Sequence, residues 1–251
     1  MTSLRETENL MVRIMTVLAD AFGNHAVLKG GMELRLLDCP IFTNDLDYIF
    51  VPFSSKNDIE DGVLNELKKN PDFSVSCSVN SKCIRYIVTC NSATVQVEVN
   101  VAQECKTSEL STSSLAQRNN MQSRIIRVMD LPSALSHKLA AWNERGLIRD
   151  LYDVYYLKVI LHVDLDFTIL KSRLLKIEPR SRGGKPGKMS IGQFVQKLKD
   201  TSFINQSDVE KELRDYLEPQ QLPGLEKKII SALNRVIEFI ESHSNSSVDS
   251  H

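Results

Sequence analysis

The sequence has little of what marks several large classes of protein. Its 251 residues include five cysteines, an odd number, and no two of them form a Cys-x-x-Cys pair. We therefore expect neither a disulfide framework nor a structural zinc site. No apolar run approaches the ~20 residues that a membrane-spanning helix needs. Because the first residues are polar, we also expect no signal peptide, and the cytoplasm is the expected location.

An excess of charge of one sign is also missing. The formal net charge is −1, so nothing draws the whole chain toward nucleic acid or a membrane, and any basic surface must be local. With 42% hydrophobic and 25% charged residues, the composition is ordinary for a globular protein. A chain of this length can bury a sizeable core in one domain or two.

Residues 25–51 offer the chemistry, and we interpret them as strand, glycine turn, short helix, loop and strand. Gly30 and Gly31 follow a short apolar run, and such a turn before a helix exposes backbone N–H groups to an anion. The second strand begins with Asp45 and Asp47. Side chains in a strand alternate between faces, so both carboxylates point the same way, about 7 Å apart along the backbone. Two carboxylates so placed suit Mg²⁺, whose shell is completed by water and substrate phosphate.

Three strand-like runs follow, at 73–79, 82–89 and 94–101, with gaps short enough for hairpins. The third run alternates valine with polar residues, which predicts a sheet with one buried and one wet face. Residues 103–120 are polar and predict a loop or irregular segment, and 124–128 predict a further strand.

Helical spacing of apolar residues covers much of the rest of the chain. Glycine and proline interrupt it at residues 180–188, where every charge is positive. That segment is either a solvated loop or a mobile arm that contacts the phosphates of a polynucleotide. Helices are predicted at 3–22, about 55–69, 130–145, from 149 onward, 163–177, 207–217 and 222–242.

Several of these segments together resemble the motifs of one family. Lys29-Gly30-Gly31, followed by Thr43-Asn44-Asp45-Leu46-Asp47, resembles the first motif of the nucleotidyltransferase superfamily. More narrowly it is similar to the AbiEii/AbiGii toxin family of bacteria. The resemblance covers roughly residues 25–160 and departs at Ile41, where the family often has arginine, and at Met32-Glu33, where it often has small residues.

Two later motifs support the narrower resemblance. His137-Lys138-Leu139-Ala140-Ala141, with Arg145 following, resembles the family's lysine-leucine-x-alanine motif. Arg149-Asp150-x-x-Asp153 resembles its arginine-aspartate-x-x-aspartate motif. The family's order and approximate spacing of motifs are kept.

The resemblance implies a fold and a division of the chain. The expected fold is α/β (α+β), with a mixed, twisted nucleotidyltransferase-type sheet and flanking helices, followed by a helical C-terminal domain. We predict a catalytic domain over residues 1–130, the helical domain over 131–243, and a disordered tail over 244–251.

The resemblance also implies the site. A third acid on a strand beside the Asp-x-Asp strand is expected, and Glu98 is the candidate, with Glu104 as the alternative. Asp45, Asp47 and Glu98 would hold one or two Mg²⁺ ions and, with Lys138, form the catalytic set. The nucleotide-binding candidates are Lys29, Gly30, Gly31, Thr43, Lys138, Arg149 and Asp153.

The reaction implied is transfer of an NMP from an NTP to an acceptor hydroxyl. The resemblance suggests an RNA acceptor, a tRNA 3′ end, and a toxin–antitoxin or phage-defence setting with a cognate antitoxin as a possible partner. Two alternatives stay open at this point. One is a nucleotidyltransferase that acts on a small molecule such as an antibiotic. The other is a non-catalytic nucleic-acid-binding protein on the same fold.

Overall fold

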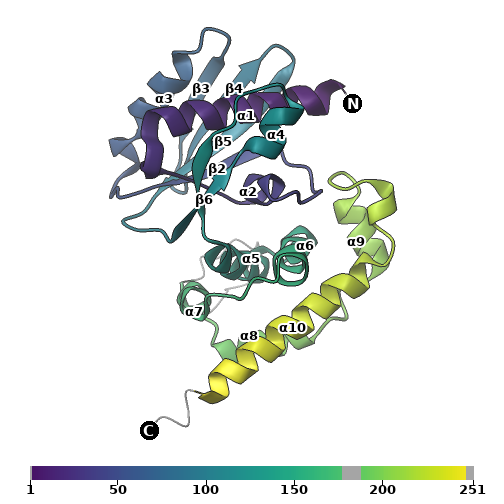
Figure 1. Ribbon diagram of the computed structural model, residues 1–251. Coiled ribbons are helices and arrows are strands. Elements are labelled where there is room, and N and C mark those ends of the chain that lie inside the picture. Colours follow the sequence, from purple (N-terminus) through teal and green to yellow (C-terminus); the bar gives the residue numbers. More distant parts are fainter. Residues whose placement is uncertain (1, 177–187, 247–251) are drawn as a thin grey trace. The chain divides into compact units, whose positions relative to one another are not determined.

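The computed structural model describes residues 2–176 and 188–246 and divides into two compact units, Met1–Asp130 and Leu131–His251 (Figure 1). Residues 180–187 of the basic segment and 247–251 of the tail lie outside the described residues, so what was expected of them stays a prediction. Residues 244–246, which were predicted to be disordered, belong to the last helix, which continues to Ser246.

Within the described part of the first unit, seven strands form one sheet in the order β3-β4-β5-β2-β1-β7-β6. Strand β2 runs parallel to β5, and β1 runs parallel to β7, whereas the other neighbours are antiparallel. The predicted mixed sheet is confirmed, and so are the hairpins between β3, β4 and β5. The strands are β1 Ala26–Lys29, β2 Asp45–Phe50, β3 Ser74–Val79, β4 Ile84–Cys90, β5 Ala93–Val101, β6 Thr107–Ser111 and β7 Ile125–Met129.

The alternation that predicts β5 is visible in its burial. Val95, Val97 and Val99 are fully buried, and the polar residues between them reach the other face of the sheet. Burial of each valine contributes about 1.5–3 kcal/mol relative to an exposed side chain. The sheet therefore has an apolar face that needs cover and a polar face that is available for chemistry.

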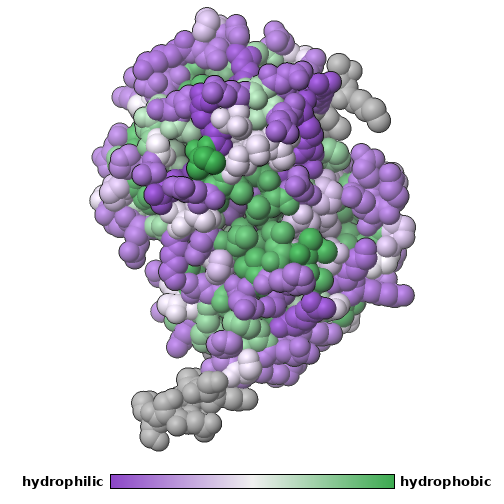
Figure 2. Space-filling model, in the orientation of Figure 1, coloured by the Kyte–Doolittle hydropathy of each residue, from purple (hydrophilic) through white to green (hydrophobic). Residues whose placement is uncertain are grey.

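Helices α1 (Thr2–Phe22), α3 (Glu60–Lys68) and α4 (Ser113–Arg118) pack on the apolar face (Figure 1). On α1, Leu10, Ile14 and Leu18 recur at turn spacing and are buried against the strands. Hydrophilic residues dominate the outer surface of this unit in the view of Figure 2. Helix α2 (Gly31–Leu36) joins β1 to the loop before β2.

The prediction for residues 103–120 is wrong, because this segment contains β6 and α4. Strand β6 lies at the edge of the sheet and, among the described strands, pairs with β7 alone, so none of its residues is fully buried and the strand lacks apolar alternation. Helix α4 has six residues and buries only Leu115 and Ala116, too few to produce a visible helical period. Polar composition alone thus concealed two short elements.

The described part of the second unit is helical, as predicted. Within it, Trp142 and Phe194 are buried and lie edge to face with ring centroids 6.2 Å apart. The helices are α5 Leu131–Arg145, α6 Ile148–Tyr155, α7 Phe167–Leu175, α8 Ile191–Lys199, α9 Gln206–Leu213 and α10 Leu225–Ser246, and a π-helical turn, η3 Tyr156–Ile160, continues α6. None of the helices among the described residues is long and apolar enough to cross a membrane.

Two helix predictions in this unit need correction. Helix α7 begins at Phe167 rather than at 163, because the Asp166 side chain accepts a hydrogen bond from Ile169 N at 2.9 Å and caps it there. Helix α8 was not predicted. Its start carries a capping box between Ser190 and Gln193, which is a recognisable sequence signal.

Candidate functional site

The aspartates predicted as metal ligands lie at the start of β2. Their side chains leave the sheet on the polar face, because Leu46 and Tyr48 occupy the buried positions of the strand. Asp47 stands opposite Lys29 of β1 on one side and opposite Glu98 of β5 on the other. The register therefore brings three of the predicted site residues into one row across the sheet.

The glycine turn after β1 lies directly against this row of side chains. Gly30 has φ +85° and ψ −146°, a combination that is essentially restricted to glycine. A Cβ atom on Gly30 would lie 2.7 Å from Asp47 Oδ2, closer than such atoms can approach. The backbone of Gly30 and the carboxylate of Asp47 are therefore in contact only because residue 30 has no side chain.

Gly31 and Thr43 are neighbours of that turn. A Cβ atom on Gly31 would lie 3.4 Å from Thr43 Oγ1, an ordinary contact, so space does not demand a glycine there. Thr43 Oγ1 lies 3.3 Å from both the backbone N and the backbone O of Asp45. The hydroxyl thus sits between the first residue of α2 and the first residue of β2.

Lys29 supplies a positive charge beside Asp47. Its Nζ lies 3.7 Å from Asp47 Oδ1, and the two side chains are 27% and 32% exposed. An ion pair at this distance and exposure is weak as a stabilising contact. Its effect is on the local charge, because the ammonium of Lys29 partly neutralises the Asp47 carboxylate, which the strand holds against the glycine turn.

Glu98 also lies against a cation. Its Oε1 accepts hydrogen bonds from Arg85 Nη2 at 2.8 Å and from Gln96 Nε2 at 3.1 Å. The hydrogen bond to Glu98, followed by the attraction of its charge, raises the pKa of the Arg85 guanidinium above its ordinary value. Glu104, the alternative third acid, is exposed and lies beyond the end of β5, without a strand position next to Asp47.

The acids on this face suit Mg²⁺ in the type of donor they offer. Mg²⁺ takes one or two carboxylates and fills the rest of its shell with water and phosphate. Asp45, Asp47 and Glu98 occupy adjacent positions on one face of paired strands. Within the described residues no three Asp, Glu, His or Cys side chains already converge as a metal site. Binding through all three acids therefore requires their side chains to turn toward a common point.

The second unit contains a buried ion pair between two of the other predicted residues. Lys138 on α5 pairs with Asp153 Oδ2 on α6, and the side chains are 17% and 6% exposed. Burial alone lowers the pKa of Lys138, but the carboxylates of Asp153 and Asp150 outweigh it and the pKa is raised. Burial also raises the pKa of Asp153 despite the neighbouring ammonium. Within the described residues, Asp153 Oδ1 has no hydrogen-bond partner.

Asp150 is braced by a second pair. Arg145 Nε donates to Asp150 Oδ2 at 2.6 Å and Nη2 donates to Oδ1 at 2.5 Å, while Asp150 is fully buried. Such a two-point pair fixes the geometry between the end of α5 and the start of α6.

Arg149 does not form its principal contact with Asp153, although the two are one helical turn apart. Its backbone N donates to Glu212 Oε1 at 2.9 Å, and its guanidinium lies over the Tyr216 ring at 5.7 Å.

Sequence reasoning missed Arg85 and Gln96, the two residues that hold Glu98. A signal for Arg85 was present. The short turn at Asn91 and Ser92 implies a hairpin, and counting back from that turn places residue 85 opposite residue 98, as the strands do. Ile41, where the family often has arginine, is buried and packs as an apolar residue.

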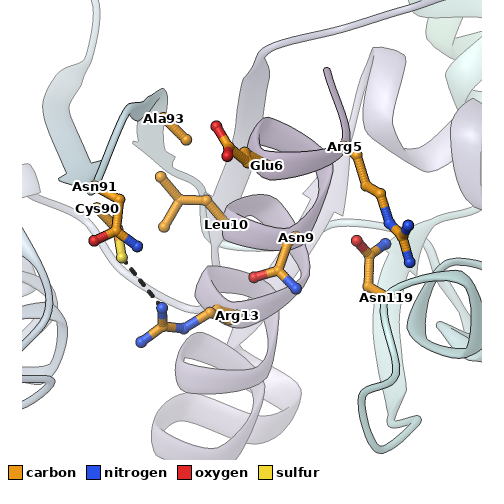
Figure 3. Close-up of a pocket in the computed structure, with 9 residues that line it drawn as sticks. All are labelled: Arg5, Glu6, Asn9, Leu10, Arg13, Cys90, Asn91, Ala93 and Asn119. Atoms are coloured by element: carbon orange, nitrogen blue, oxygen red, sulfur yellow. Dashed lines mark hydrogen bonds between the residues drawn. The ribbon is translucent and has the colours of Figure 1, made fainter. Parts of the chain in front are cut away.

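A pocket of about 280 Å³ in the first unit contains none of the predicted site residues. It lies along the N-terminal half of α1 and is lined in part by Arg5, Asn9, Arg13 and Asn119 (Figure 3). Arg13 Nη1 donates to Cys90 Sγ at 3.2 Å, the dashed line in Figure 3, and its Nη2 pairs with Asp72 at 2.7 Å. The arginine is thus used within the fold, and the predicted site residues of this unit lie elsewhere.

Comparison with known families gives a match over most of the chain. Residues 13–231 match the family model described as "Nucleotidyl transferase AbiEii toxin, Type IV TA system". A comparison with curated proteins gave no match.

Solved structures share the fold at low identity. JHP933 from Helicobacter pylori is 18% identical, with a TM-score of 0.57 over 97% of this chain and 96% of that one. MenT4, a nucleotidyltransferase toxin from Mycobacterium tuberculosis, is 16% identical, with a TM-score of 0.60 over 94% of this chain and 83% of that one. A putative nucleotidyltransferase from H. pylori is 17% identical, with a TM-score of 0.54 over 95% and 96%. The predicted nucleotidyltransferase-type fold is confirmed.

Proposed function

The chain belongs to the AbiEii nucleotidyl transferase toxin family of type IV toxin–antitoxin systems, and from that premise we propose how its residues carry out the transfer. It is a nucleotidyltransferase, and its substrate is an NTP. The proposed reaction is Mg²⁺-dependent transfer of an NMP to the hydroxyl of an RNA, a tRNA 3′ end. The hydroxyl oxygen bonds to the α-phosphorus, the bond between the α- and β-phosphates breaks, and pyrophosphate and the hydroxyl proton are released.

The contact between Gly30 and Asp47 carries the proposal. A turn that only glycine can form lies against an acid at a strand start, so backbone and carboxylate meet at one point of the polar face. Exposed backbone N–H groups favour an anion, and the carboxylate favours a cation. A metal-bound triphosphate presents both charges at once.

The acids of the row are proposed as the metal ligands. Asp47 and Glu98 occupy paired positions on β2 and β5, and Asp45 lies two residues before Asp47 on the same face. When bound, Mg²⁺ would polarise the phosphoryl oxygens and lower the pKa of the acceptor hydroxyl. The opposite faces of these strands are buried, so the backbone that carries the ligands is already fixed before a metal binds.

The phosphates of the NTP are proposed to bind to the glycine turn and to two side chains beside it. The backbone N–H groups of Gly30 and Gly31 and the hydroxyl of Thr43 border the Asp-x-Asp strand. Lys29 pairs with Asp47, and its ammonium would be available to a phosphate oxygen if a bound metal held that carboxylate. Each of these groups supplies a donor or a positive charge, as a triphosphate requires.

The residues of the second unit keep the roles that the family motifs imply. Lys138 is proposed to contact nucleotide phosphate, and Asp153 is proposed as a nucleotide-binding residue. The ion pair between the two also holds the Lys138 ammonium in place. Arg149 is proposed as a nucleotide-binding residue, and the Arg145–Asp150 pair fixes the start of the helix that carries it.

Transfer of labelled nucleotide tests the proposal. Each NTP, labelled at the α-phosphate, is incubated with Mg²⁺, total bacterial RNA and either the natural protein or Asp47→Asn. Label is expected in a tRNA-sized band with the natural protein and not with Asp47→Asn. The matched control is Asp20→Asn, which removes an exposed carboxylate of the same unit that pairs with Arg124.

Two results would contradict parts of the proposal. Label that appears without RNA, in a small acceptor, would overturn the RNA assignment and leave the transfer chemistry. Absence of labelled product with every NTP, together with absence of NTP binding, would overturn the transfer itself.

A further inference from the structure

Both hydrogen bonds to Glu98 meet the same oxygen. Arg85 Nη2 and Gln96 Nε2 donate to Oε1 at 2.8 and 3.1 Å. Within the described residues Oε2 accepts no hydrogen bond that would compete with another ligand. One oxygen of the carboxylate is thus held by the protein, and the Glu98 side chain is still 27% exposed on the polar face.

The two donors come from positions that the sheet fixes. Arg85 of β4 stands directly opposite Glu98, and Gln96 lies two residues before Glu98 on β5, on the same face. Behind them, Tyr86 and Val97 are fully buried, so the backbone of both strands is anchored in the core. On the other side, Gln96 and Glu98 face Asp45 and Asp47 of β2.

We infer that Arg85 and Gln96 are positioning residues, which fix the Glu98 carboxylate through Oε1 so that Oε2 is left to bind the metal shared with Asp47. This inference rests on the proposed function. Metal-ligating carboxylates are commonly hydrogen-bonded by residues that do not touch the metal, and loss of such a partner costs about 10- to 100-fold in metal affinity or activity. Glu98 has a flexible side chain, so fixing one oxygen removes rotamers that metal binding would otherwise have to freeze.

A purely structural role for Arg85 is disfavoured by its exposure. The Arg85 side chain is 41% exposed, and ion pairs this open to solvent contribute little to folding. Removal of Arg85 should therefore leave the fold intact while changing the behaviour of Glu98.

A single Arg85 substitution gives a mixed signal, because loss of a positive charge near the acids favours a cation while loss of positioning disfavours it. A double-mutant cycle separates the two effects. Arg85→Gln, Glu98→Gln and the double variant are compared with the natural protein. The readout is Mn²⁺ affinity, measured from the electron paramagnetic resonance signal of free Mn²⁺, so no turnover is needed.

With Arg85 present, Glu98→Gln should weaken Mn²⁺ binding about 10-fold or more. In the Arg85→Gln background the same change should weaken it only about 2- to 3-fold, because Glu98 is no longer held. Gln96→Met should show the same coupling to a smaller extent. The control is Arg124→Gln, which breaks the ion pair with Asp20 in the same unit and should show no coupling to Glu98→Gln.

Equal losses from Glu98→Gln with and without Arg85 would overturn the positioning role. An unchanged Mn²⁺ affinity in Glu98→Gln, with loss of binding in Asp47→Asn, would also overturn it and leave the proposed transfer standing. If the natural protein neither binds Mn²⁺ nor transfers nucleotide, the proposed function fails and the inference fails with it. Circular dichroism of each variant confirms that the comparison is between folded proteins.

Discussion

Asp47 Oδ2 lies 2.7 Å from the point that a Cβ atom on Gly30 would occupy, so the acid and the turn fit together only while residue 30 is glycine. The backbone of Gly30 adds a second constraint, since its φ of +85° with ψ of −146° is strained for any other residue. This relationship connects the predicted anion-binding turn to the predicted metal ligand. A substitution of Gly30 therefore tests both predictions at once.

Gly30→Ala should lose at least about 100-fold in transfer rate, because a displacement near 1 Å at a reacting centre has that cost. It should also lose roughly 1–3 kcal/mol of unfolding free energy from backbone strain. Gly23→Ala is the control, since Gly23 has φ +51° in the same unit but nothing within 4 Å of its Cβ position. Denaturant unfolding and transfer rates measure both. A transfer rate for Gly30→Ala equal to that of Gly23→Ala would contradict the role of the contact.

Lys29→Met should raise the KM for NTP about 10-fold or more while changing the unfolding free energy by less than about 1 kcal/mol. The reason is that the Lys29–Asp47 pair is long and partly exposed, so its value lies in the charge offered to phosphate. Lys69→Met, which breaks an exposed pair with Glu66, is the matched control and should leave KM unchanged. A fall in kcat with an unchanged KM would contradict a role of Lys29 in binding the NTP before the reaction and would assign its contact to the transition state.

The Lys138–Asp153 pair allows structural and chemical roles to be separated. Lys138→Met alone should cost about 3–5 kcal/mol of unfolding free energy, because it leaves a buried carboxylate without its partner. The double variant Lys138→Met/Asp153→Leu should recover most of that stability, since apolar residues of similar volume replace buried pairs well. Transfer activity should stay lost in both. Recovery of activity together with stability would mean that Lys138 only supports the fold.

The cost of Lys138→Met should depend on pH. Burial is the largest influence on the pKa of the Asp153 carboxyl and raises it, the Asp150 charge raises it further, and without the Lys138 ammonium the weaker Arg149 charge is what remains to lower it. The folded form then binds a proton more readily than the unfolded form, so the deficit is largest at neutral pH and shrinks as the pH falls through that pKa. Thermal unfolding at a series of pH values measures it. A deficit that grows on acidification would contradict this account.

Much of the sheet was predictable because its strands obey simple local rules. The valines of β5 alternate with polar residues, and the turn at Asn91 and Ser92 sets the register that places Arg85 opposite Glu98. The edge strand β6 and the short helix α4 were not predicted, because an edge position and a length of six residues leave no periodic pattern in the sequence. Helix α8 escaped although Ser190 and Gln193 carry its capping box.

The sequence suggests residue types for the site, but it does not give the contacts that those residues make. Sequence spacing places Asp153 one turn after Arg149, yet Asp153 pairs with Lys138 from another helix, which only the packing of α5 on α6 determines. In the same way, the steric fit of Gly30 to Asp47 joins two strands that are separated by a helix and a loop. Non-local pairings of this kind depend on register and rotamer, and neither can be obtained from spacing.

Thr43 offers the last test, because its hydrogen bonds to the backbone are long. Oγ1 lies 3.3 Å from both Asp45 N and Asp45 O, so the hydroxyl contributes little to the fold, about 0.5 kcal/mol or less. If that hydroxyl binds nucleotide instead, Thr43→Val should raise the KM for NTP about 5- to 10-fold with stability unchanged. Thr43→Ser restores the hydroxyl while it removes the methyl group that lies 3.8 Å from the Cβ position of Gly31, and it should restore KM. Steady-state kinetics of the two variants decide the matter, because an equal defect in both would assign Thr43 to packing against the turn.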